Sequence, residues 1–498
     1  MMPRRHESLG AVAVLLGSVM GCIVGRAAPA ADVQVLPAPP AGGSRPAFTA
    51  KGTELCVRCH RSEQNAWIDS STTAVWRHDA HSRAHLALAP ENPRTRGMEE
   101  VLGIKAAATA ACVACHTHPA GEPAIEEENS VVHAGISCET CHGAGSGYFE
   151  PHMETRWRFL SSAEKEALGM HDLRNPVSKA ENCLSCHLGD VESGKVITHA
   201  MYAAGHPPLP AFEMESFGKG MGPHWKRVWD KSLPIREQAA AAGYRTETAS
   251  ESQRSLIGGL VALRESITLV EDYATAFRDV GGERPWPELA LYDCQACHHE
   301  LKIPSGRQQA GYGGLVPGRP SLVRWPRGLA GVAFAEAGLP TDVDELVAPW
   351  VTALNGRPFA EPGALRATAA SREQVARIDQ AIAALAAVSR DAAAARSRER
   401  MAKLAAAGER AGDLESARLL GWVLQTALRE DGGVHPPARD AAIGSLEKVL
   451  ALAFPSPAYP EPPSTQKPFW QASLSAARDA DIDRIHAAFR QAGASRGE

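Results

Sequence analysis

The sequence predicts a mainly α-helical protein with extensive loops, in which a cysteine-rich N-terminal part is followed by an all-helical C-terminal module. Aromatic residues make up only 6% of the chain while Ala and Gly are abundant, which favours helices and loops over a β-sandwich. All cysteines precede residue 298, and the region beyond has helical periodicity between Gly and Pro breakers. The 498 residues allow about two or three domains.

The N-terminus has the pattern of an export signal. A basic start at Arg4 and Arg5 precedes an apolar run over residues 9–25 and the small residues "APA", so residues 1–31 are predicted to be a signal peptide. Cys22, in "VMGC", loosely resembles a lipoprotein acylation site, and a lipid anchor is the alternative to cleavage. We therefore expect a periplasmic or extracellular protein.

The composition divides the rest of the chain into three parts. Residues 32–50 are rich in Pro, Ala and Gly and predict a flexible linker. Residues 51–328 contain repeated cysteine motifs and form the expected N-terminal domain, and residues 329–498 form the helical C-terminal domain. The net charge of -5 gives no indication of a nucleic-acid partner.

Helical periodicity is strongest in five stretches. The first begins after Ser250, a candidate N-cap, and ends before Gly281. The other four lie in the C-terminal module and favour a compact bundle packed on the N-terminal domain. The five stretches are residues 250–280, 372–410, 413–430, 437–454 and 479–493.

Ten of the eleven cysteines fall into five copies of one pattern, C-x-x-C-H. The five copies, called the first to fifth motif in chain order, are "CVRCH", "CVACH", "CETCH", "CLSCH" and "CQACH". The cysteines are Cys56, Cys59, Cys112, Cys115, Cys138, Cys141, Cys183, Cys186, Cys294 and Cys297, and the motif histidines are His60, His116, His142, His187 and His298.

This spacing has a chemical reason. Two thiols three positions apart can add to the two vinyl groups of one haem, and the adjacent imidazole can then bind the iron. Zinc sites and disulfides are the alternatives, but neither explains a histidine after every second cysteine. The pattern therefore predicts five covalently attached haem c groups.

The remaining histidines matter because a low-spin haem needs a second axial ligand, whereas a catalytic haem leaves that position open. Most of the 19 histidines lie between residues 60 and 299, in the same part of the chain as the motifs. Candidate sixth ligands are thus available in excess.

Several stretches resemble the multihaem cytochromes of the cytochrome c-554 type, related to the hydroxylamine oxidoreductase-like group. They are "DAHSRAHLAL", "GISCETCHGAG", "THAMYAAGHPPL" and the long segment around the fifth motif, and the resemblance covers residues 51–328. It implies closely packed haems, many of them with two histidine ligands. Carried over position by position, it suggests as distal ligands His81, His152, His199, His206 and His224.

A further hypothesis concerns the relative position of His199 and His206. If "THAMYAA" is helical, a spacing of seven places both rings on one face, roughly 10 Å apart. Gly205 and the following Pro-Pro pair would end that helix at the second histidine. One short element could then present an imidazole to each of two haems.

These features favour an exported, low-potential electron carrier with mostly bis-His haems and unidentified redox partner proteins. The alternative is a multihaem oxidoreductase acting on a small nitrogen compound at one five-coordinate haem. The resemblance weakens that alternative, because no motif has Lys in place of its histidine, as in related nitrite reductases, and no haem-crosslinking tyrosine is identified. A third class is a docking subunit, whose C-terminal helices attach the haem domain to a respiratory complex.

Overall fold

The computed structural model describes residues 48–60, 72–118, 135–221, 231–241, 249–279, 287–299, 301–305, 307–308, 311–312, 315, 317–355, 369–430, 437–450 and 481–494. The predicted signal peptide with Cys22, nearly all of the predicted linker, and His224 lie outside these residues. The prediction of a mainly α-helical fold is confirmed, because the described residues contain no strand apart from two isolated bridges, Asp190 with Lys195 and Tyr292 with Leu322.

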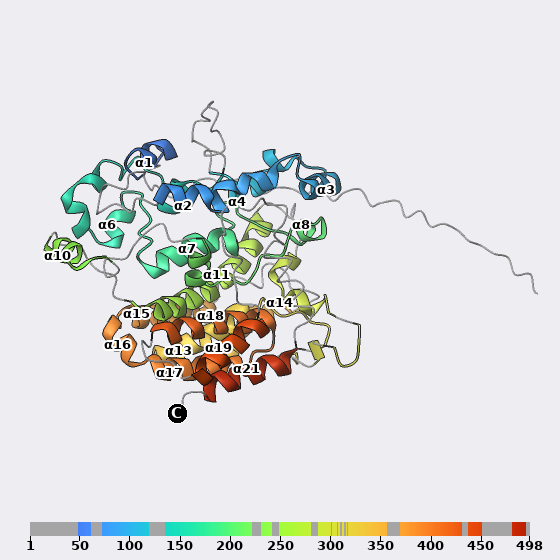
Figure 1. Ribbon diagram of the computed structural model, residues 1–498. Coiled ribbons are helices and arrows are strands. Elements are labelled where there is room, and N and C mark those ends of the chain that lie inside the picture. Colours follow the sequence, from blue (N-terminus) through green and yellow to red (C-terminus); the bar gives the residue numbers. More distant parts are fainter. Residues whose placement is uncertain are drawn as a thin grey trace, which may run out of the picture.

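Short helices and turns form the motif-bearing part of the molecule, at the top of Figure 1. In chain order they are α1 (Thr53–His60), α2 (Thr72–His78), η1 (His81–Leu88), α3 (Pro93–Leu102), η2 (Ala106–Ala108), α4 (Ala110–His116), α5 (Cys138–His142), η4 (Pro151–Met153), η5 (Thr155–Phe159), α6 (Ser162–Glu166), α7 (Pro176–His187), α8 (His199–Ala203), α9 (Met214–Gly220) and α10 (Leu233–Ala241). Two further turns, η7 (Leu289–Leu291) and η8 (Cys294–Ala296), carry the chain into the fifth motif.

Longer helices form the C-terminal bundle at the bottom of Figure 1. They are α13 (Trp325–Glu336), α14 (Val343–Leu354), α15 (Ala369–Ala386), α16 (Arg390–Ala395), α17 (Ser397–Gly408), α18 (Leu414–Glu430), α19 (Pro437–Leu450) and α21 (Ile482–Ala494). The helical pattern predicted over residues 372–410 is thus divided among α15, α16 and α17. The first break occurs where Ser389 caps α16, its hydroxyl accepting a hydrogen bond from the amide of Ala392 at 3.3 Å, and the second occurs at Arg396, which has no side-chain cap.

The long helix α11 (Glu251–Asp279) joins the two parts. It packs against α7 and α9 on one side and against α13, α15 and α18 on the other (Figure 1). Leu256, Leu260 and Ile267 on this helix are at most 1% exposed. At Gly259 an added Cβ would lie 2.7 Å from Leu329, so the absence of a side chain lets α13 approach closely. The buried core therefore continues across residue 328, where the sequence suggests a domain boundary.

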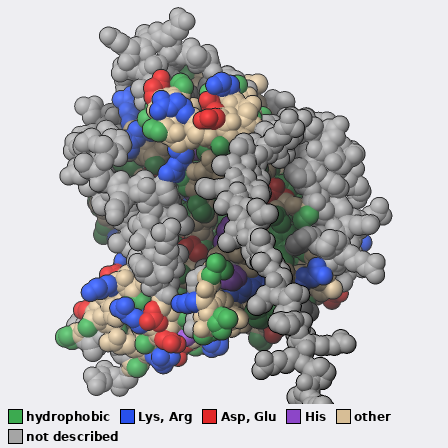
Figure 2. All heavy atoms as spheres, turned by 90° about the vertical axis from the view of Figure 1, so that its right-hand side faces the viewer, with side chains coloured by type: hydrophobic (Ala, Val, Ile, Leu, Met, Phe, Trp, Pro, Cys, Tyr) green, Lys and Arg blue, Asp and Glu red, His purple; other side chains and the backbone are tan. Residues whose placement is uncertain are grey.

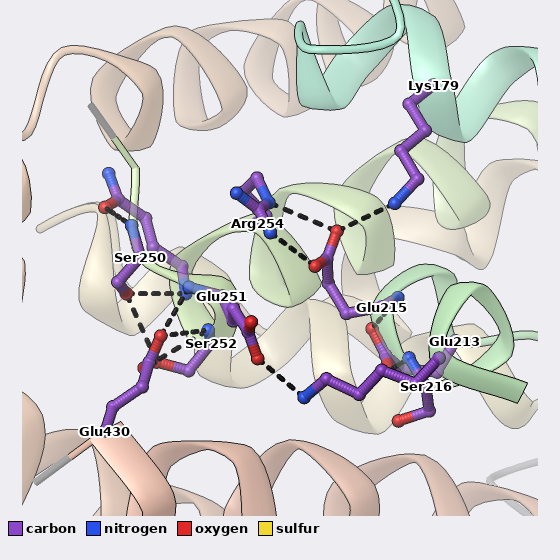
Figure 3. A network of polar contacts seen from close by, with 11 residues as sticks. Lys179, Glu213, Glu215, Ser216, Ser250, Glu251, Ser252, Arg254 and Glu430 are labelled. Atoms are coloured by element: carbon purple, nitrogen blue, oxygen red, sulfur yellow. Dashed lines mark hydrogen bonds and ion pairs between the residues drawn. The ribbon is translucent and has the colours of Figure 1, made fainter. Parts of the chain in front are cut away.

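The start of α11 agrees with the prediction. The hydroxyl of Ser250 accepts a hydrogen bond from the amide of Gln253 at 3.3 Å, and the side chain of Gln253 accepts one from the amide of Ser250 at 3.2 Å. This reciprocal pair satisfies two amides that the helix itself leaves unbonded. Glu430, at the end of α18, adds a carboxylate that accepts from the amide of Ser252 at 3.2 Å (Figure 3).

A buried polar network ties the fourth-motif helix α7 to the rest of the core. Glu215 on α9 forms ion pairs with Lys179 on α7 at 3.1 Å and with Arg254 on α11 at 2.5 Å (Figure 3). The side chains of Glu215 and Arg254 are only 3% and 4% exposed. Because both charges are paired, the burial of each is compensated, and the network fixes α7 relative to α11.

Within the described residues, no helix is long and apolar enough to cross a membrane.

Candidate functional site

Four of the five C-x-x-C-H motifs occupy the last turn of a helix. Helices α1, α4, α5 and α7 each end at their motif histidine. The fifth motif is also a helical turn, in which the amide of His298 donates to the carbonyl of Cys294 at 2.7 Å. Positions i, i+3 and i+4 of a helix share one face, so both thiols and the imidazole of a motif lie on the same side of one turn. This arrangement suits attachment of all three groups to one macrocycle.

His81, in turn η1, faces the fourth-motif histidine. The ring centres of His81 and His187 are 6.1 Å apart. The ring of His187 also stacks on Phe212, with centres 4.8 Å apart, which fixes its orientation. Burial lowers the pKa of His187 to about 3, so this imidazole is neutral and has a nitrogen lone pair available for a metal.

His206 faces the second-motif histidine, with ring centres 6.4 Å apart. The Nδ1–H group of His116 donates to the carbonyl of Ala84 at 3.1 Å, and that of His206 donates to the carbonyl of Pro207 at 2.7 Å. Because a carbonyl oxygen can only accept, Nδ1 carries the proton in both rings and Nε2 is the free nitrogen. Burial lowers the pKa of both histidines, which favours the neutral, ligating form.

His199 faces the fifth-motif histidine, His298, with ring centres 6.1 Å apart and the rings inclined by 29°. A buried carboxylate links the two segments that carry these histidines. Glu288 accepts a hydrogen bond from the amide of His199 at 2.7 Å and another from the amide of Ala290, in η7, at 2.8 Å. It thereby joins the start of α8 to the turn that precedes the fifth motif.

His152 lies near the first motif. Its positive form lowers the pKa of His60, after the larger effect of burial, so the two rings are electrostatically coupled. Tyr148 and Trp157 surround His152, with ring centres 6.1 Å and 6.4 Å from its own. The Nδ1–H of His152 donates to the carbonyl of Phe149 at 2.5 Å, which again leaves Nε2 as the free nitrogen.

The structure thus places three of the five predicted distal histidines opposite motif histidines, each at a different motif, and His152 close enough to affect the pKa of His60. The fifth, His224, lies outside the described residues. The third motif has His171 beside it, whose Nδ1–H donates to the carbonyl of Cys141 at 3.1 Å. His171 is not among the predicted distal ligands, and its ring contacts the backbone of α5.

The hypothesis about the helix of His199 and His206 needs a correction. Helix α8 is only five residues long and ends at Ala203, so the two histidines do not share a helical face. Gly205, with φ +114°, turns the chain, and the amide of His206 donates to the carbonyl of Met201 at 2.9 Å. The turn nonetheless directs the two rings to different motifs, the fifth and the second.

The distances between ring centres in the three histidine pairs can be compared with the distance expected for two imidazoles that bind one iron. With a metal–imidazole bond of roughly 2 Å, two imidazoles on opposite sides of one metal have ring centres roughly 6 Å apart. The three pairs have this separation. Five of these residues are partly buried and His298 is exposed. Some histidine side chains reach the surface on the face shown in Figure 2. The residues therefore fit bis-His haem ligation.

The alternatives to haem find no support among the described residues. The ten described motif cysteines form no disulfide. Within the same residues, no three side chains of His, Cys, Asp or Glu are grouped closely enough to hold a metal ion such as zinc. Interaction between the two thiols raises the pKa of Cys115 and lowers that of Cys186, so the second motif lies near the fourth.

Comparisons with known proteins point in the same direction. Residues 55–143 match the family model described as cytochrome c554 and c-prime. Over 194 residues the chain is 25% identical to cytochrome c-554 of Nitrosomonas europaea, an alignment that covers 35% of this chain and 76% of that protein. No solved structure gives a significant match. The chain is therefore similar to cytochrome c-554 over part of its length, and the matched residues 55–143 are followed by further helices.

Two carboxylates near the histidine pairs were not identified from the sequence. Glu288 is far from His199 along the chain, and only the fold brings them together. Asp79 lies two residues before His81, and its Oδ1 accepts from the Nδ1–H of that ring at 2.9 Å. A carboxylate close in sequence to a candidate ligand is the signal that could have identified Asp79.

Proposed function

We propose that this protein is an exported electron carrier that passes electrons through five covalently bound haem c groups, most of them with two histidine ligands. One observation carries the proposal. Three motif histidines, from the second, fourth and fifth motifs, each face a second histidine at the separation that suits a shared iron. His152 near His60 supports the same ligation at the first motif.

The haem group, once bound, supplies a one-electron couple between ferric and ferrous iron. The protein residues fix and tune it. Each motif would hold the group through its two cysteines and its histidine, and the distal histidines would bind the iron in place of a substrate. Two imidazole ligands, rather than His and Met, favour a low reduction potential.

The arrangement of the motifs supports transfer between haems within the molecule. One turn, η1, provides His81 to the fourth motif and the carbonyl of Ala84 to the second-motif histidine. Redox partner proteins outside the chain are needed to supply and accept the electrons. Export to the periplasm or cell surface is part of the proposal, because c-type haem is attached outside the cytoplasm.

Haem quantitation together with carbon monoxide binding tests this function. We expect five haems per chain, measured as the pyridine haemochrome against protein concentration. The reduced protein should give little carbon monoxide difference spectrum, because bis-His haems have no open position. A stoichiometry clearly below five contradicts the haem count. Strong carbon monoxide binding to the intact protein would instead favour the alternative function, an oxidoreductase with one open haem.

A further inference from the structure

Asp79 makes an unusual contact with a candidate distal ligand. Its carboxylate Oδ1 accepts hydrogen bonds from the Nδ1–H of His81 at 2.9 Å and from the backbone amide of His81 at 2.7 Å. The side chain of Asp79 is only 4% exposed. In contrast, His116, His152 and His206 donate their Nδ1–H groups to backbone carbonyls. His81 therefore differs from these three histidines because its Nδ1–H donates to a carboxylate and not to a backbone carbonyl.

The local fold holds Asp79 rigidly in this position. Its amide donates to the carbonyl of Trp76 at 3.0 Å, and its carbonyl accepts from the hydroxyl of Ser82, a buried residue, at 2.9 Å. The indole of Trp76 is itself anchored on the carbonyl of Ile136 at 2.9 Å. The carboxylate is thus held by the turn between α2 and η1 and does not depend on a long, mobile side chain.

The charge of Asp79 is poorly compensated. Its second oxygen, Oδ2, is buried and has no hydrogen-bond partner among the described residues. Within those residues its ion-pair partner is the imidazole of His81. Because the side chain is buried, solvent and salt screen this negative charge less than they would at the surface.

A carboxylate in this position acts on a ligated iron in two ways. It strengthens the Nδ1–H hydrogen bond, which makes the imidazole a stronger electron donor through Nε2. It also adds a fixed negative charge near the iron. Both effects stabilise ferric relative to ferrous iron, because the ferric form carries one more positive charge.

We propose that Asp79 is a positioning residue that lowers the reduction potential of the haem at Cys183–His187 through its bond to the distal ligand His81. The inference rests on the proposed function, which makes His81 and His187 the two ligands of that haem. The fourth motif lies near the second, because turn η1 places His81 opposite His187 and the carbonyl of Ala84 on the ring of His116. Asp79 therefore sets the potential of a haem inside the chain of haems, and with it the energy step that electrons cross there.

The test is Asp79→Asn, studied by redox titration of the fully loaded protein with optical and EPR detection. Asparagine keeps a hydrogen-bond acceptor of the same shape and removes only the charge. We expect one of the midpoint potentials to become more positive, with at least a tenfold change in its reduction equilibrium, about 59 mV for a one-electron couple. The haem count should stay the same and all affected haems should remain low spin.

Two further variants identify the haem and control for the loss of buried charge. His81→Ala should convert one haem to high spin, and the potential that shifts in Asp79→Asn should belong to that haem. Asp172→Asn removes another buried carboxylate, one that pairs with Arg174 at 3.0 Å. It should leave the potential of the fourth-motif haem within the error of the titration. If the asparagine variant does not assemble, Asp79→Ser, which is also neutral, should show the same positive shift of that midpoint potential.

The outcomes separate this inference from the proposed function. If His81→Ala gives one high-spin haem but neither neutral variant shifts a potential, the role of Asp79 is wrong and the bis-His assignment stands. If His81→Ala leaves every haem low spin, the assignment of His81 as a ligand is wrong, and the proposed ligation fails with it. A uniform shift of all potentials in Asp79→Asn would also overturn the inference, because it would indicate a general structural effect.

Discussion

The rings of His116 and His206 lie 6.4 Å apart, although they come from different helical segments, α4 and the turn after α8. Their orientations are fixed independently. His116 is held by the carbonyl of Ala84, and His206 by the carbonyl of Pro207. In each ring Nδ1–H is engaged with a backbone carbonyl, so Nε2 is the nitrogen that remains available as a ligand. Such an arrangement suits two ligands of one metal better than a hydrogen-bonded pair.

Removing His206 is expected to open one haem without detaching it. In His206→Ala the haem at Cys112–His116 keeps both thioethers and its motif histidine but loses its sixth ligand. The spectrum should show one high-spin haem and new carbon monoxide binding, with the haem count unchanged. His486→Ala is the matched control, because that histidine contacts the carbonyl of Ala411 in the bundle. An unchanged spectrum in His206→Ala would remove His206 from the ligand set.

The short segment with His199 and His206 predicts that the effects of removing each histidine on the number of high-spin haems add. Because the two rings face the fifth and the second motif respectively, His199→Ala and His206→Ala should each open a different haem. The double variant should then show two high-spin haems, measured by EPR spin quantitation. If the double variant matches either single variant, the two histidines serve one haem, and the pairing described here is incorrect.

Some of this site could be predicted from the sequence because its chemistry is local. The five motifs, and the helical turn each forms, follow from spacing within five residues. The supply of distal histidines was also visible, and four of the five proposed ones lie near motif histidines. Which motif each histidine faces depends on long-range packing, such as the Glu288 contact that joins α8 to the fifth motif. No periodicity in the sequence contains that information.

The fold shows the same division between local and long-range information. The stretch after Ser250 was predicted as a helix from its periodicity and cap, and α11 has these features. Its role at the centre of the molecule was not predicted, because both of its sides are buried by segments distant in the sequence. Likewise, the first break within residues 372–410 reflects a single cap at Ser389 in an otherwise continuous helical pattern.

The buried network around Glu215 predicts a large loss of stability when one charge is removed. Glu215→Gln leaves Arg254, whose side chain is 4% exposed, without its buried carboxylate partner. We expect a decrease of about 3 kcal/mol in the free energy of unfolding, measured by denaturant titration of the haem-loaded protein. The double variant Glu215→Gln/Arg254→Met should recover at least half of this loss, because it no longer buries an unpaired guanidinium.

A half-exposed ion pair provides the control for this network. Lys219 pairs with Glu251 at 2.6 Å, and their side chains are 42% and 28% exposed. Lys219→Met should change the free energy of unfolding by less than about 1 kcal/mol, since solvent screens such pairs. Equal losses in Lys219→Met and Glu215→Gln would show that burial does not determine the strength of these interactions here.

Asp272 on α11 predicts a specific dependence of stability on pH. Burial, and then the neighbouring carboxylates Asp190, Glu271 and Glu192, raise its pKa to about 6. A carboxyl group with a raised pKa binds its proton more tightly in the folded state than in the unfolded state. Its contribution to stability is therefore fully present below about pH 4, the ordinary value, and is lost as the pH rises through about 6.

Asp272→Asn should remove this dependence. The variant should gain stability relative to the wild type between pH 4 and 7, reaching about 1 kcal/mol above pH 7 after allowance for solvent screening of this half-buried group. Unfolding temperatures measured from pH 4 to 8 give the comparison, with the exposed Asp391→Asn on α16 as the control. A constant difference between variant and wild type across this range would mean that Asp272 does not titrate there. A difference of the opposite sign would mean that ionised Asp272 stabilises the fold through a cation, contrary to the cluster of carboxylates that surrounds it.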